Sequence, residues 1–158
     1  MRRIIIPGDP VAKGRPRSSA RGGRVIVRTP ERTRRAEAWV AACAAGAAQA
    51  GSVVGPLALR AVFSRVRPKR LRRKSDPRGA VWAPTKPDAD NLLKLLKDGL
   101  KALWGDDAQV VHVEAAKVYA PIGCEPCTVV DVWPAGDVPA WALDMLDAAQ
   151  AASDGGAS

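Results

Sequence analysis

Residues 90–105 read Asp-Asn-Leu-Leu-Lys-Leu-Leu-Lys-Asp-Gly-Leu-Lys-Ala-Leu-Trp-Gly, and this stretch carries the clearest helical pattern of the chain. At about 100° per residue, its large apolar side chains share one broad face. These side chains are Leu92, Leu93, Leu96, Leu100, Leu103 and Trp104. A second face, within about 60°, carries Asp90, Lys94, Lys97 and Lys101. The sequence therefore predicts an amphipathic helix over Asp90–Leu103, closed by Gly105.

Strand patterns lie on both sides of this helix. Leu57–Val66 alternates between two faces, whereas Gln109–Tyr119 and Thr128–Trp133 have the composition of strands. Arg3–Ile6 and Arg24–Val27 are short β-branched runs. We therefore expect three longer strands and two shorter ones.

Two further helices are expected. Thr29 is the predicted N-cap of a helix with Pro30 at its first position, running to about Ala50. A last amphipathic helix is expected at about Pro139–Ala149, with an apolar side formed by Trp141, Met145 and Leu146. The order of elements predicts an α/β (α+β) fold, in which a mixed sheet in a single domain carries two main helices.

The length of 158 residues fits one domain. We expect this domain to span residues 1–136, followed by a C-terminal helix and disordered tail over 137–158. Residues 7–23 are rich in Gly, Pro, Ser and Arg and are predicted to form a flexible basic loop. Residues 67–86 are predicted to be a mobile basic loop, because they are too polar and too interrupted by proline to pack.

The charge is strongly basic and unevenly distributed. Lys and Arg number 25 against 16 Asp and Glu, which gives a net charge of +9. Residues 1–35 carry 11 basic and 2 acidic side chains, and residues 67–86 carry 8 basic and 1 acidic. Such a surface favours an anionic partner, either nucleic acid or an anionic membrane surface.

No apolar run approaches the roughly 18 residues that a membrane-spanning helix needs. The apolar stretch near the N-terminus is too short for a signal peptide. The three cysteines are an odd number without an export signal, so we expect a reduced, cytoplasmic setting and no membrane partner.

Two pairs of carboxylates flank the 90–103 helix: Asp88 with Asp90, and Asp106 with Asp107. Two carboxylates 4 Å apart repel by about 4 kcal/mol at an effective dielectric of 20, so a cluster favours a bound cation. Hard oxygen ligands select Mg²⁺ or Mn²⁺. A helix of about 14 residues spans roughly 20 Å. The pairs can therefore meet only if the chain folds back at Gly105 or the following strand, or if a second subunit brings them together.

Each acidic residue also has a purely structural interpretation. Asp90 fits the N-cap of the helix, with Asp88 interacting with the helix dipole, and Asp106-Asp107 fits an ordinary turn. Lys94 is either half of an i,i+4 ion pair with Asp90 or a group that holds a phosphate. The charge distribution favours metal binding over these alternatives.

The basic segments supply the predicted DNA contacts. Lys117 lies in an apolar strand, where it is either an edge-strand gatekeeper or a phosphate contact. The remaining predicted contacts are Lys13, Arg15, Arg17, Arg67, Lys69, Arg70, Arg72, Arg73, Lys74 and Lys86.

Residues 86–94, read as Lys-Pro-Asp-Ala-Asp-Asn-Leu-Leu-Lys, are followed by Asp98-Gly99-Leu100 and then by Trp104-Gly105-Asp106-Asp107-Ala108-Gln109-Val110-Val111 and Lys117. This order and spacing resemble the RusA family of Holliday junction resolvases. That family combines a P-D-x-D-N-L-x-K helix start with a D-D-x-Q-V strand start and a downstream lysine.

The resemblance implies a homodimeric, Mg²⁺-dependent endodeoxyribonuclease that makes paired symmetric nicks in four-way junctions, with Mn²⁺ able to substitute. By position, the family's essential acidic residues fall on Asp88, Asp90 and Asp107, which would be metal ligands. Its important lysine falls on Lys94, and Asp106 has a less defined role. The long basic 67–86 loop and the Ala- and Asp-rich C-terminal extension depart from the family pattern and bear on substrate range.

Two other candidate sites are not favoured. Cys124-Glu125-Pro126-Cys127 is a C-x-x-C, but zinc needs two further ligands and only Cys43 and His112 are available. His112 is interpreted as an ordinary strand residue.

The sequence therefore predicts hydrolysis of phosphodiesters in branched DNA. Two rival functions stay open: a basic protein that binds branched DNA without cutting it, and a flap or fork nuclease of the same fold.

Overall fold

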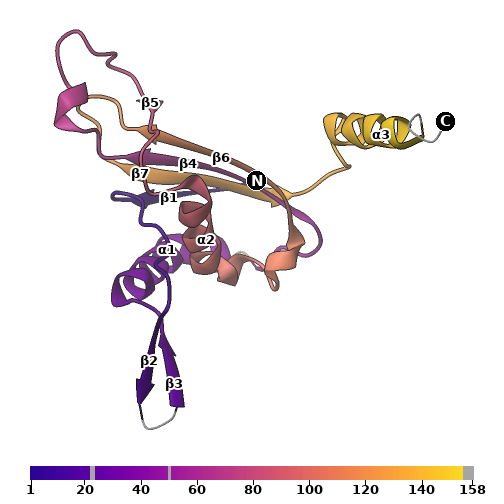
Figure 1. Cartoon of the computed structure of the whole chain (residues 1–158), viewed down its shortest axis with the longest axis horizontal. Helices are drawn as coiled ribbons and strands as arrows, with labels where there is room; N and C mark the ends of the chain where they lie inside the picture. Colours follow the sequence, from indigo (N-terminus) through magenta and orange to yellow (C-terminus); the bar gives the residue numbers. More distant parts are fainter. Residues whose placement is uncertain (22–23, 50, 155–158) are drawn as a thin grey trace.

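The framework of the computed structural model, which describes residues 1–21, 24–49 and 51–154, is a five-stranded mixed sheet (Figure 1). Its strands follow the order β1-β7-β4-β6-β5. β4 pairs antiparallel with β7 and parallel with β6. The bounds are β1 Arg2–Pro7, β7 Cys127–Pro134, β4 Leu57–Arg65, β6 Val110–Tyr119 and β5 Val81–Trp82.

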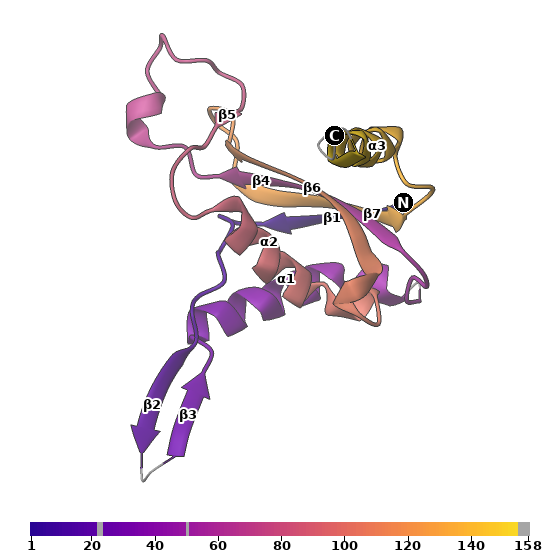
Figure 2. The same ribbon diagram turned by 45° about the vertical axis from the view of Figure 1, so that its right-hand side comes forward.

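Two helices cover one face of this sheet (Figures 1 and 2). They are α1, Glu31–Gln49, and α2, Ala89–Gly99. The parallel pairing of β4 with β6 requires a crossover connection, and α2 lies within it. The predicted α/β fold with two main helices on a mixed sheet is confirmed.

The core lies between the sheet and these helices. Leu57, Leu59 and Phe63 of β4 are buried there, together with Leu92 and Leu96 of α2. The alternation predicted for β4 is confirmed from Leu59 to Phe63, where Arg60 and Val62 are exposed, but not at Ala58, which is buried. Burial of this apolar surface provides the main stabilisation of the fold.

Gly99 lets α1 and α2 approach closely. A Cβ atom placed on Gly99 would lie 2.6 Å from Cβ of Val40 on α1. Real Cβ atoms do not come this close, so only glycine fits without movement of the backbone. The same residue ends α2 earlier than predicted: Lys101–Leu103 continues as a short 3₁₀ helix, η2.

The N-terminal basic region contains a hairpin that the sequence analysis missed. β2, Arg17–Arg21, pairs antiparallel with β3, Arg24–Arg28, and the hairpin projects away from the sheet in both views (Figures 1 and 2). The prediction of a loop over residues 7–23 is therefore wrong for residues 17–21. The predicted strand at 24–27 is confirmed.

The 67–86 segment packs more than expected. It contains the 3₁₀ helix η1, Lys69–Leu71, and strand β5. The first residue of the segment, Arg67, is only 3% exposed. Its Nη1 donates a hydrogen bond to the carbonyl oxygen of Gly79 at 3.0 Å. Most of the segment is nevertheless exposed, with Arg67 and Ala83 as its buried residues, and its mobility stays a prediction.

The last helix, α3, Ala140–Asp154, stands apart from α1 and α2 (Figure 1). Its predicted apolar residues Trp141, Met145 and Leu146 each expose more than half of their surface. The first turn contacts the sheet through Trp141, whose ring lies 6.4 Å from that of His112. No helix in the described ranges is long and apolar enough to cross a membrane.

Candidate functional site

Asp88 occupies the N-cap of α2 and exposes its carboxylate. Its backbone is extended, with φ −73° and ψ 151°, and its side chain makes no capping hydrogen bond. The sequence analysis offered Asp90 as the N-cap of this helix, but the residue at the N-cap is Asp88. Because the helix does not use the Asp88 carboxylate, both oxygens are available to another ligand.

Asp90 lies in the first turn of α2 and faces Lys94. The Nζ of Lys94 is 3.3 Å from Oδ2 of Asp90, and both side chains are about two-thirds exposed, at 63% and 62%. An exposed i,i+4 pair of this kind contributes only a few tenths of a kcal/mol to stability. Both charges therefore face solvent and can be drawn into another interaction at low cost.

The Asp106-Asp107 pair separates into two roles. The carboxylate of Asp106 accepts from the backbone N–H of Ala108 and forms a capping box with Gln109 at the start of η3, Asp107–Gln109. Asp107 accepts a hydrogen bond at Oδ1 from the indole Nε1 of Trp104 at 2.9 Å. Asp106 thus stabilises the turn. A buried tryptophan, 2% exposed, orients Asp107 and leaves its second oxygen unassigned.

The three candidate metal ligands are not gathered into one cluster. Among the residues that the structure describes, no group of three or more His, Cys, Asp or Glu side chains is arranged to hold a metal ion. Asp88 and Asp90 share the first turn of α2, whereas Asp107 follows the helix. The oxygen donors suit Mg²⁺ in type, and the Asp88 carboxylate makes no capping bond, so Asp88 and Asp90 fit a magnesium ion in part.

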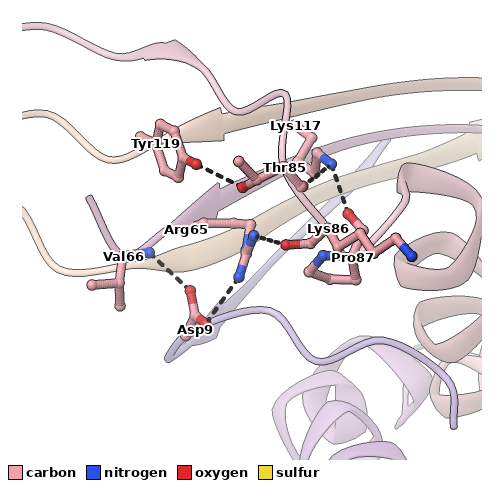
Figure 3. A network of polar contacts seen from close by, with 8 residues as sticks. All are labelled: Asp9, Arg65, Val66, Thr85, Lys86, Pro87, Lys117 and Tyr119. Atoms are coloured by element: carbon pink, nitrogen blue, oxygen red, sulfur yellow. Dashed lines mark hydrogen bonds and ion pairs between the residues drawn. The ribbon is translucent and has the colours of Figure 1, made fainter. Parts of the chain in front are cut away.

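The loop that leads into Asp88 is held by side chains from the ends of two strands (Figure 3). The Nζ of Lys117 on β6 donates to the carbonyl oxygens of Thr85, at 2.7 Å, and Pro87, at 2.6 Å. Nη1 of Arg65, the last residue of β4, donates to the carbonyl of Lys86 at 2.7 Å. Three successive carbonyls before Asp88 are thus bound by two cationic side chains.

Two further contacts complete this network (Figure 3). The hydroxyl groups of Thr85 and Tyr119 are hydrogen-bonded at 2.7 Å. Asp9 accepts from the N–H of Val66 at 2.8 Å, and its other oxygen lies 3.8 Å from Nη2 of Arg65. Arg65 therefore links the loop between β1 and β2 (residues 8–16, the N-terminal loop) to the loop that precedes Asp88.

Asp88 borders an open groove of about 940 Å³. The groove lies between the N-terminal loop, the start of α1 and the loop before α2. Its charged lining residues are Asp9, Arg15, Arg32, Arg65, Lys86 and Asp88. Arg65 is occupied by Asp9 and by the loop before Asp88, but the other three cations still outnumber the two carboxylates, which suits a phosphate backbone next to the Asp88 carboxylate.

The N-terminal loop is fastened to α2 by Lys13. Its backbone N–H donates to the carbonyl of Asn91 at 3.0 Å, and its ammonium forms an ion pair with Asp98. This hydrogen bond with Asp98 raises the pKa of Lys13, and Glu37 and Asp107 add to the effect through space. Lys13 is thus committed to an internal contact rather than standing free toward DNA.

The other predicted DNA contacts fall into several groups. Arg67 is buried, so its predicted contact with DNA is withdrawn. Arg15 and Lys86 line the groove, and the side chain of Arg17 lies outside the described part of the chain. The other predicted contacts within the 67–86 segment are exposed: Lys69, Arg70, Arg72, Arg73 and Lys74. Lys117 instead donates to the carbonyl oxygens of Thr85 and Pro87.

Sequence reasoning missed Arg32, Arg65 and Asp98 as parts of the site. The signal for Asp98 was its i,i+4 spacing after Lys94, which places it on the polar side of α2. No local signal distinguishes Arg65, because its partners lie 21 and 56 residues away along the chain.

A family model described as "Endodeoxyribonuclease RusA" matches residues 7–130. An uncharacterized protein of Bacillus subtilis strain 168, YqaN, is 33% identical over 124 residues, which cover 75% of this chain and 87% of YqaN. The family match spans the groove, α2 and both carboxylate pairs, and it ends before α3.

Proposed function

The chain belongs to the endodeoxyribonuclease RusA family, and from this premise we propose that it resolves four-way DNA junctions by Mg²⁺-dependent paired nicks. The observation that carries the proposal is the position of Asp88. Its carboxylate makes no capping bond, although it stands at the helix N-cap, and it borders a predominantly basic groove. A DNA backbone bound in that groove would pass beside an available metal ligand.

In this proposal Asp88, Asp90 and Asp107 are the metal ligands. A bound Mg²⁺ would lower the pKa of a water molecule and neutralise charge on the scissile phosphate. Lys94 would exchange its contact with Asp90 for the phosphate, whose charge increases in the transition state. Asp107 would reach the metal ion held by Asp88 and Asp90 either through movement of the turn at Gly105 or from a second subunit.

The proposed molecule is a homodimer. A four-way junction has two-fold symmetry, so two sites related by a two-fold axis can cut both strands in one encounter. Sedimentation at micromolar concentration should give about twice the 16.7 kDa chain mass. A monomer that still makes paired nicks would contradict this assignment.

The decisive experiment is cleavage of a labelled four-way junction with and without Mg²⁺, beside flap, fork and linear duplex substrates. We expect symmetric nicks in the junction only when Mg²⁺ is present. Tight junction binding without cleavage would instead identify a DNA-binding protein. Equal or faster cleavage of flaps or forks would identify a nuclease of different specificity.

A further inference from the structure

Thr85, Lys86 and Pro87 are the last three residues of the connection between strand β5 and Asp88, the residue proposed to bind the metal. Thr85 and Lys86 are exposed, so water could satisfy their carbonyl oxygens. In the structure, the side chains of Arg65 and Lys117 donate hydrogen bonds to these carbonyl oxygens instead. Carbonyls that water could have satisfied are thus held by two cationic side chains, so the arrangement constrains the loop as well as satisfying its backbone groups.

The two cations constrain the backbone in complementary ways (Figure 3). Lys117 binds the carbonyls of Thr85 and Pro87, and so fixes the distance across the residue between them. Arg65 binds that middle residue, Lys86. Both cations stand on neighbouring parallel strands, β4 and β6, whose backbones are hydrogen-bonded to each other within the sheet. The peptide that enters Asp88 is thus held from both strands.

We infer that Arg65 and Lys117 are positioning residues for Asp88, which present its carboxylate to a divalent cation in one orientation. This inference rests on the proposed function. Mg²⁺ requires near-ideal octahedral geometry at about 2.0–2.1 Å from its ligands. A carboxylate on a loosely held loop must be ordered at the moment of binding, which weakens the affinity.

Arg65 has a second consequence for the same site. Through Asp9 it connects the loop before Asp88 to the N-terminal loop, which contributes Arg15 to the groove. One side chain thereby sets the relative position of a proposed metal ligand and a proposed phosphate contact. Neither Arg65 nor Lys117 needs to touch the reacting atoms for this effect.

The test compares Arg65→Met and Lys117→Met with the wild-type chain in junction cleavage over a range of Mg²⁺ concentrations. We expect the Mg²⁺ concentration for half-maximal activity to rise by about 10- to 100-fold, as when groups that orient metal ligands are removed. Junction affinity measured with Ca²⁺ should change less than about twofold, with an unaltered salt dependence. The conservative variant Arg65→Lys keeps a donor for Lys86 and should recover much of the metal affinity.

Arg60→Met is the matched control. Arg60 lies on β4 five residues before Arg65 but on the opposite face of the sheet, where it pairs with Glu114 at 2.6 Å. Its loss removes a strand arginine and an ion pair without touching the loop before Asp88. The Mg²⁺ dependence of Arg60→Met should match that of the wild-type chain. Melting temperatures of all variants identify any that are unfolded, and Arg65→Lys then carries the test.

Two results would overturn the inference. Normal Mg²⁺ dependence combined with weaker junction binding and a shallower salt dependence would make these residues phosphate contacts. Equal Mn²⁺ affinity of the wild-type and variant proteins, measured by calorimetry, would also refute positioning. The calorimetric measurement tests the inference even if the wild-type chain cuts no junction. Absence of cleavage would contradict the proposed function alone.

Discussion

Substitution of Gly99 by alanine tests the close contact between α1 and α2. The new methyl group would lie 2.6 Å from Cβ and 2.7 Å from Cγ1 of Val40, and 3.0 Å from the backbone oxygen of Glu37. Overpacking of a core costs about 1–3 kcal/mol. Alanine offsets part of this cost through its higher helix propensity, by at most about 1 kcal/mol. We therefore expect a net loss of about 1–2 kcal/mol in the free energy of unfolding.

Thermal or urea unfolding followed by circular dichroism measures this loss. For a chain of this size, 1 kcal/mol corresponds to about 2–4 °C in the melting temperature. Gly46→Ala is the matched control, because Gly46 lies within α1 and a Cβ there meets nothing within 4 Å. It should stabilise the protein by up to about 1 kcal/mol.

A double substitution identifies which contacts cause the overpacking. Val40→Ala removes Cγ1, which the new methyl group would meet at 2.7 Å, but keeps Cβ at 2.6 Å, so combining it with Gly99→Ala should cost somewhat less than the two single changes added together. Strict additivity would locate the effect in the contacts with the Cβ of Val40 and the backbone oxygen of Glu37. A Gly99→Ala protein at least as stable as the wild type would refute the close approach altogether.

Three further predictions concern the site, the basic segment and the sheet. Three substitutions should each abolish junction cleavage while leaving junction binding intact or tighter: Asp88→Asn, Asp90→Asn and Asp107→Asn. Each removes a proposed metal ligand and a negative charge near the phosphates. Near-normal cleavage by any of these variants would exclude that residue from the metal site. Neutralising the exposed residues Lys69, Arg70, Arg73 and Lys74 should flatten the plot of log K against log salt by about 0.9 for each lost phosphate contact, and an unchanged slope would exclude this segment from the DNA interface. The hydrogen bond and charge of Arg3 hold the pKa of Asp131 below its usual range, so this pair stabilises the fold above about pH 4 and loses its contribution as the pH falls through the lower, folded-state pKa. The difference in melting temperature between wild type and Asp131→Asn should therefore shrink below pH 4, and a constant difference would count against the pair.

Local periodicity was sufficient for the main elements of the fold. The alternation around Phe63 predicted the central strand, and the leucine spacing around Leu96 predicted α2, because burial on one face imposes both patterns. The hairpin was missed because its first strand, Arg17–Arg21, is polar and lacks an apolar alternation. Gly22-Gly23 between two short runs was the available signal.

The sequence singled out three acidic residues of the candidate site and the groove cations Arg15 and Lys86, but not the way in which other residues support them. Asp88, Asp90 and Asp107 stand out because clustered carboxylates need an explanation, whereas the supporting groups are ordinary cations in the sequence. Arg67 illustrates the limit: in the sequence it resembles its basic neighbours, yet in the structure it is buried against Gly79. Which arginine is buried depends on the path of the whole segment, and residue type alone does not determine it.

The pairing of β1 with β7 has a consequence for how the chain is made. β1 contains the first residues of the sheet, and its strand partner β7 begins at Cys127. At about 5–20 residues per second, the ribosome takes roughly 6–24 s to synthesise the intervening chain. During that interval Ile4 and Ile6 have no strand to pair with, and β4 lacks its antiparallel neighbour. The nascent chain therefore presents unpaired strand edges until the last strand emerges, and such edges can pair with other chains and aggregate.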